Sequence, residues 1–75
     1  MSPKLPVVRP EEVVGALEKA GWRVHRRRGS HVSMHREGVA YVITVPLHRR
    51  DMPKGTLRGI IKDAGLTLEE FVNLL

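Results

Sequence analysis

Residues 22–36, WRVHRRRGSHVSMHR, decide the fold. They predict two short strands, residues 22–27 and 31–36, joined by a turn at Arg28-Gly29-Ser30. On the second strand, the apolar residues Val32 and Met34 alternate with polar ones and should face a core. The same alternation leaves three polar side chains together on the opposite face: His31, Ser33 and His35.

Alternation on the first strand predicts an inward and an outward set of side chains. The inward set is Trp22 and Val24, and the outward set is Arg23, His25 and Arg27. Glu37-Gly38 predicts a second turn. Residues 39–45 are the most apolar run and predict the best-buried strand, which ends at Pro46 because proline donates no ladder hydrogen bond. We also interpret Tyr41 as a core residue.

Helices are expected on both sides of these strands. Residues 10–20 begin with Pro10, which suits the first helical position, and are followed by Gly21, which suits the position after the C-cap. Residues 53–64 predict a second helix with apolar residues at helical spacing, closed by Gly65. Thr67-Leu68-Glu69-Glu70 is a capping box that opens a short third helix ending at Leu74.

The element order is therefore α-β-β-β-α-α, an α+β fold. Short connections favour an antiparallel meander. Both long helices must bury their apolar stripes on one face of a three-stranded antiparallel sheet, which leaves the other face free. A chain of 75 residues is sufficient for one domain, residues 1–75.

The composition of the chain indicates the cellular compartment in which we expect the protein. The chain has no cysteine, so no disulfide or thiolate–zinc site stabilises it, which fits a reducing compartment. Its apolar runs are too short to span a membrane. The segment Met1-Ser2-Pro3-Lys4 leads into no apolar export signal, so we expect a cytoplasmic protein without a membrane partner.

Positive charge is concentrated in the middle of the sequence. Residues 23–62 hold ten Lys and Arg against two acidic residues, a formal +8, within a chain of net charge +5. Such a concentration predicts a polyanionic partner, and nucleic acid is the commonest one. The alternative is a solvated basic surface without a partner.

His31 is the candidate catalytic residue. An imidazole titrates near neutral pH and can give or take a proton. Arg26, Arg27 and Arg28 supply positive charge beside it and are candidate RNA-binding residues. Cleavage of RNA by its own 2′-hydroxyl needs a base, an acid and cations for the phosphate. Ser30 could donate a hydrogen bond to a phosphate oxygen. The alternative is a surface histidine without a role.

Three further residues are candidates for RNA contacts: His35, Lys54 and Arg58. His35 shares a strand face with His31, but four strand residues span roughly 13 Å, which suits adjacent phosphates better than one atom. Lys54 and Arg58 recur at helical spacing and form one stripe, which is either an RNA contact or a solvated face. We favour a structural role for His48. A metal site is disfavoured because only Glu37 adds a carboxylate near the histidines.

Several short motifs occur together in a fixed order: Gly21-Trp22, Gly29-Ser30-His31, Val45-Pro46-Leu47-His48, Gly55-Thr56-Leu57-Arg58-Gly59-Ile60-Ile61, Ala64-Gly65 and Glu69-Glu70-Phe71. On these motifs, residues 10–75 resemble the HicA toxin family, the mRNA interferases of HicAB toxin–antitoxin systems. The sequence departs from the common pattern at Pro53 and in its very basic Arg26-Arg27-Arg28.

The resemblance implies a fold similar to a double-stranded-RNA-binding domain. It implies a metal-independent endoribonuclease that needs no cofactor, cuts messenger RNA and is neutralised by a HicB-type antitoxin. The catalytic histidine of the family carries over to His31. Two other functions stay open: an RNA-binding module that does not cut, and a protein-interaction unit for an acidic partner. A homodimer is also left open.

Overall fold

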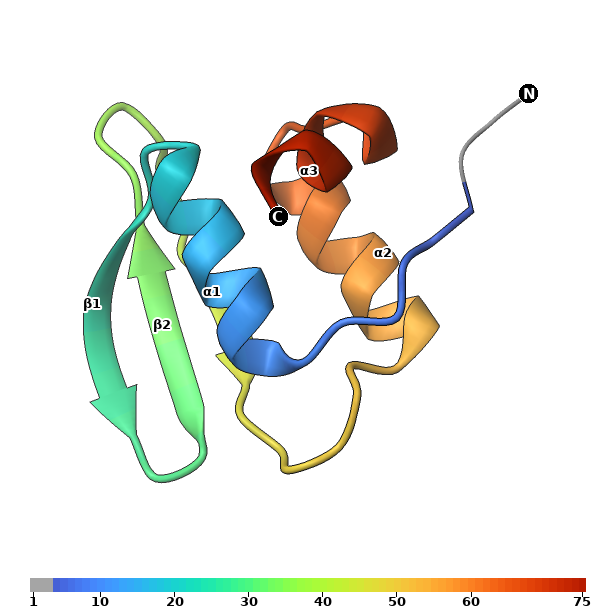
Figure 1. Ribbon diagram of the computed structural model, residues 1–75. Coiled ribbons are helices and arrows are strands. Elements are labelled where there is room, and N and C mark those ends of the chain that lie inside the picture. Colours follow the sequence, from blue (N-terminus) through green and yellow to red (C-terminus); the bar gives the residue numbers. More distant parts are fainter. Residues whose placement is uncertain (1–3) are drawn as a thin grey trace.

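The computed structural model describes residues 4–75. Residues 1–3, which belong to the segment considered above as a possible export signal, lie outside the described residues. The element order is α-β-β-β-α-α, as the sequence predicts. Figure 1 shows the strands on one side of the molecule, α1 against them, and α2 with α3 beyond.

The sheet is an antiparallel meander, as expected. It consists of β1 (Arg23–Arg28), β2 (His31–His35) and β3 (Ile43–Pro46), in the order β1-β2-β3. Gly29 and Ser30 form the tight turn between β1 and β2. Gly29 has a φ of 57°, which favours glycine at the first central position of the hairpin turn.

Strand β2 follows the predicted alternation. Val32 and Met34 are fully buried, whereas His31 and His35 are exposed. The two apolar residues contribute to the core beneath the helices, so β2 presents its polar residues on the other side of the sheet.

Strand β1 departs from the prediction. The pairing shifts between Val24 and Arg26, which marks a β-bulge at His25. A bulge adds one residue to one strand and so reverses the alternation beyond it. Arg27 therefore pairs with the inward residue Val32 and lies on the helix side of the sheet, not on the outward side. The prediction for Val24 is also wrong in part, because 41% of this residue remains exposed.

Strand β3 is shorter than the predicted run of residues 39–45. It begins at Ile43, which pairs with Met34 of β2, and residues 39–42 form no ladder with β2. Ile43 and Val45 are buried as expected. Tyr41 is 52% exposed, so its interpretation as a core residue is wrong; its hydroxyl donates a hydrogen bond to the carbonyl of Asp63 at 2.6 Å.

Helix α1 (Pro10–Lys19) has the predicted ends. Pro10 is its first residue, and Gly21, with a φ of 98°, follows the C-cap. The backbone N–H groups of Gly21 and Trp22 donate to Glu18 and Leu17, which is the Schellman pattern. Trp22 is thereby turned into the core, where it is 1% exposed.

The last two helices are α2 (Lys54–Asp63) and α3 (Leu68–Leu74). Thr67 and Glu70 form the predicted capping box at the start of α3. The apolar stripe of α2, together with α1, the sheet and Phe71, builds one hydrophobic core. Both α1 and α2 pack against β3. Within residues 4–75, no helix has the length and apolar character needed to cross a membrane.

Candidate functional site

The sheet face that points away from the core, called here the outer face, carries three cross-strand pairs of polar residues. The register places Arg28 opposite His31, Arg26 opposite Ser33 and Arg23 opposite His35. Paired residues on adjacent antiparallel strands project to the same side, with Cβ atoms about 5 Å apart. Each outward residue of β2 therefore has an arginine beside it.

The bulge produces this arrangement. Because alternation reverses after His25, both Arg26 and Arg28 reach the outer face. Strict alternation from Val24 would have turned them toward the helices. Burial of a guanidinium without a partner is costly. The bulge thus keeps these two charges in water and at the same time aligns them with Ser33 and His31.

The outer face is electrostatically uncompensated. Among residues 4–75, those that pair on this face include three arginines and no carboxylate. Within residues 4–75, the ion pair found is that of Arg9 with Glu11, which lies elsewhere. An exposed row of unpaired guanidinium groups raises the local positive potential and attracts polyanions.

His31 lies at the end of this row, next to the hairpin turn. Its Nδ1 atom is 3.5 Å from the hydroxyl oxygen of Ser30, at the outer limit of hydrogen bonding. On its other side it pairs with Pro46 of β3. The carbonyl of Ser30 accepts a hydrogen bond from the backbone N–H of Leu47. The segments Gly29-Ser30-His31 and Val45-Pro46-Leu47-His48 are therefore neighbours in space.

His35 lies at the far end of the row, as the sequence predicted. Its ring centroid is 6.2 Å from that of His25, so the bulge residue is also on the outer face. Arg23, opposite His35, was not among the predicted contact residues. The pairing of Arg23 with His35 depends on the strand register, which the sequence of either strand alone does not reveal.

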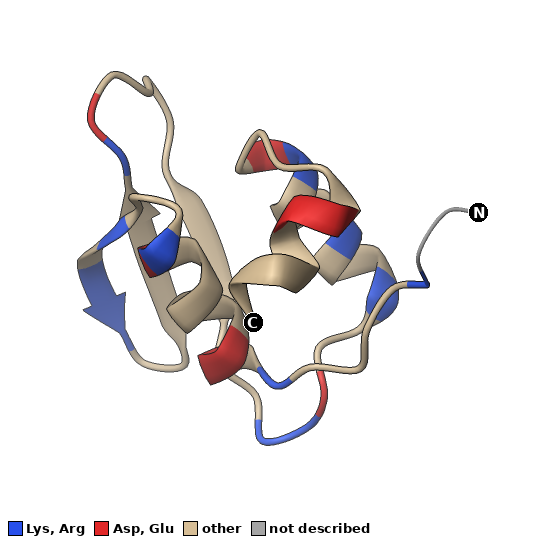
Figure 2. Cartoon of the chain, turned by 45° about the horizontal axis from the view of Figure 1, so that its top comes forward, with Lys and Arg blue, Asp and Glu red and all other residues tan. Residues whose placement is uncertain are grey.

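Other predicted contact residues lie apart from this row. Arg27 projects from the opposite side of the sheet, for the reason given above. Lys54 and Arg58 are exposed on α2, on the other side of the molecule from β1 (Figure 2). Among residues 4–75, no three His, Asp or Glu side chains come close enough to hold a metal ion.

Comparison with known proteins identifies one family. Residues 10–66 match the family model described as HicA toxin of bacterial toxin-antitoxin. No curated protein sequence matches the chain. Among solved structures, the chain is similar to one in a HicA3 and HicB3 toxin-antitoxin complex, with 40% sequence identity and a TM-score of 0.63. That similarity covers 77% of this chain and 94% of the other.

Proposed function

This chain belongs to the HicA toxin family of bacterial toxin-antitoxin systems, and on that basis we propose that it is a metal-independent endoribonuclease that uses His31 as its proton-transfer group. The observation that carries the proposal is the pairing of His31 with Arg28 on the exposed outer face. A titratable imidazole beside a fixed guanidinium supplies two of the requirements for cleaving a phosphodiester.

The reaction is an attack of the ribose 2′-hydroxyl on the adjacent phosphate. His31 removes the hydroxyl proton while the 2′-oxygen bonds to phosphorus, or it gives a proton to the departing 5′-oxygen. Water carries out the other proton transfer. The bond between phosphorus and the 5′-oxygen breaks, leaving a cyclic phosphate and a 5′-hydroxyl. Arg28 stabilises the charge that develops on the phosphate oxygens.

RNA backbone contacts extend along the outer face. Arg26, one pair further along the sheet, is placed for a neighbouring phosphate, and His35 with Arg23 for one beyond. Ser30 donates its hydroxyl hydrogen to a phosphate oxygen near His31. Lys54 and Arg58 on α2 belong to a separate surface and bind only an RNA long enough to reach it.

The partner of the toxin is a HicB-type antitoxin. One solved structure to which the chain is similar is a HicA3 and HicB3 toxin-antitoxin complex. The direct way to silence the enzyme is to mask its proton-transfer group, so we expect the antitoxin to cover His31 on the outer face. A complex in which His31 stayed open to solvent would contradict this expectation.

The test compares the parent chain with His31→Ala in a cleavage assay that contains a chelator, and in bacteria, where growth arrest and mRNA decay are scored. Loss of a proton-transfer group lowers the rate by about 10²–10⁴, while RNA affinity changes little. His25→Ala is the matched control, because this exposed histidine is not near His31 in the sheet register.

Equal cleavage by the parent and His31→Ala would disprove the enzymatic role of His31. RNA binding without any cut product from the parent would instead favour a non-catalytic RNA-binding module. Loss of all cleavage in the chelator would disprove metal independence.

A further inference from the structure

A groove of about 390 Å³ lies beside the Gly29-Ser30 turn, on the helix side of the sheet. It is formed by the start of α1, the end of β1 and the loop that follows β3. Residues from these three segments line it: Arg9, Glu11, Arg27, Leu47, His48 and Arg49. None of them belongs to the outer face.

The groove has an excess of positive charge. It holds three arginines and a single carboxylate, that of Glu11, which lies 3.9 Å from Nε of Arg9. Within residues 4–75, no acidic side chain is within ion-pair distance of Arg27 or Arg49. Arg27 reaches the groove only because the bulge at His25 turns it inward. The charges there are thus available to an anion.

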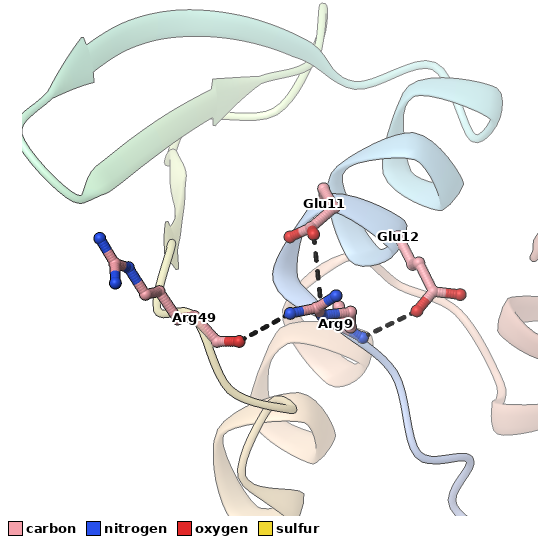
Figure 3. Close-up of polar contacts among 4 residues, drawn as sticks. All are labelled: Arg9, Glu11, Glu12 and Arg49. Carbon is pink, nitrogen blue, oxygen red and sulfur yellow. Dashed lines mark hydrogen bonds and ion pairs between the residues drawn. The ribbon is translucent and has the colours of Figure 1, made fainter.

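The loop at the groove is held in place by the N-terminal segment. Nη2 of Arg9 donates a hydrogen bond to the carbonyl oxygen of Arg49 at 2.9 Å. The backbone N–H of Met52 donates to the carbonyl of Val8 at 2.7 Å. Figure 3 shows the guanidinium of Arg49 turned away from Arg9, whereas the backbone carbonyl of Arg49 is bonded to the Arg9 side chain. Because the backbone at Arg49 is already held, ligand binding has to order only the Arg49 side chain and not the loop as well.

The groove and the outer face meet at the same end of β1. Arg27 and Arg28 are consecutive residues, with Cα atoms about 3.8 Å apart, yet they project to opposite sides of the sheet. Strand β1 is an edge strand, and in the part of the chain that the structure describes no other strand pairs with its free side. A flexible polyanion that contacts Arg28 can therefore continue around this edge to Arg27.

We propose that this groove binds a backbone phosphate of the RNA that flanks the phosphate positioned at His31. The inference rests on the proposed ribonuclease function and adds a phosphate subsite to it. Arg27 and Arg49 are the groups that bind the anion, and Arg9 is a positioning residue that holds the loop of Arg49.

The first experiment measures RNA affinity against salt concentration, with single-stranded RNA and with His31→Ala as the background so that the RNA stays intact. Adding Arg27→Gln or Arg49→Gln should weaken binding about tenfold. Each change should also reduce the slope of log affinity against log salt by about 0.7, the value for one lost phosphate contact. Lys19→Gln removes an equal charge from the far end of α1 and should change neither quantity.

The second experiment shifts the affinity in the opposite direction. Glu11→Gln removes the carboxylate that lines the groove and its repulsion of a phosphate, so RNA should bind more tightly. Glu18→Gln is the matched control, because Glu18 is exposed on the same helix but does not line the groove. A groove of purely structural importance would not yield tighter binding from Glu11→Gln.

The outcomes separate this inference from the function on which it rests. Unchanged affinity and salt slope in the groove variants, with RNA binding by the background intact, would overturn the phosphate subsite alone. So would a loss of antitoxin binding with RNA affinity unchanged, because the occupant would then be an acidic segment of the partner. If His31→Ala and the parent both fail to bind RNA, both proposals fall.

Discussion

Strands β1 and β2 are neighbours in one sheet, but only β2 follows the alternation of its sequence. Val32 and Met34 are fully buried and fix which side of β2 faces the core. All six residues of β1 are exposed, and a bulge reverses its alternation in the middle. Burial determines the register where apolar side chains are present, whereas a strand without buried side chains accepts a bulge at little cost.

The two sides of the sheet therefore have different roles, one in stability and the other in the proposed function. The inward side of β2 contributes to the core, and the outward sides of β1 and β2 present the arginines and histidines that we propose for RNA. Substitutions on the two sides should therefore change different measured quantities. The following predictions test that division, beginning with the largest expected effect.

Replacement of the outward residue His31 by alanine should lower the cleavage rate by about 10²–10⁴. Because the side chain is exposed, the midpoint of thermal unfolding should stay close to that of the parent. Cleavage kinetics and thermal unfolding on the same preparation measure both quantities. A large fall in Tm would place His31 among the residues that hold the fold.

Replacement of the inward residue Met34 by alanine should have the reverse effect. Met34 is fully buried, so its truncation should lower the free energy of unfolding by about 2–5 kcal/mol. Denaturant unfolding measures this loss. The cleavage rate per folded molecule should remain that of the parent at low temperature, and a change in that rate would mean that the two sides of the strand are coupled.

Arg28 and Arg27 give the same contrast on β1. Arg28→Gln should lower kcat by about 10²-fold, because it removes a group that stabilises the phosphate opposite His31. Arg27→Gln should instead raise KM and leave kcat near that of the parent. Steady-state kinetics with one RNA substrate distinguish the two. Equal losses of kcat would indicate that both arginines face the reacting phosphate.

Lowering the pH should reduce the stability of the fold through the capping box of α3, which lies outside the sheet. The backbone N–H of Thr67 donates to Oε1 of Glu70 at 2.8 Å, and this bond, with the Thr67 side chain, lowers the pKa of Glu70. Since the folded pKa is below the unfolded one, the stabilisation is present at neutral pH. It is lost as pH falls through the lowered pKa.

Thermal unfolding at several pH values tests this. Glu70→Gln should remove that part of the acid dependence, whereas Glu69→Gln should retain it. Thr67→Ala, which removes the cap itself, should cost about 1 kcal/mol at neutral pH. An identical acid dependence in the parent and in Glu70→Gln would contradict the role of the capping box.

Deletion of His25 should have the smallest effect. It removes the extra residue of the bulge and leaves Arg26 opposite Ser33 and Arg28 opposite His31. Cleavage should therefore stay near the level of the parent. Cross-strand contacts between Arg28 and His31, measured by nuclear magnetic resonance, should persist. If β1 had no bulge, the same deletion would reverse the arginines and abolish these contacts.

Much of the fold follows from the sequence because its signals are local. Pro10 and Gly21 mark the ends of α1, Thr67 and Glu70 begin α3, and the alternation of β2 places His31 outward. These features depend on hydrogen bonds or side-chain directions within a few residues. The motifs around His31 also indicated the family that the comparisons identify.

Long-range contacts decided the rest. Strand β3 begins at Ile43 through its pairing with Met34, and the hydroxyl of the exposed Tyr41 donates to the carbonyl of Asp63, a residue of α2. The face of each arginine in Arg26-Arg27-Arg28 depends on the bulge at His25. The sequence by itself determined that arginines lie near His31. Only the tertiary structure decided that Arg28 is the one beside it, because strand register is set by pairing between segments and not by either segment alone.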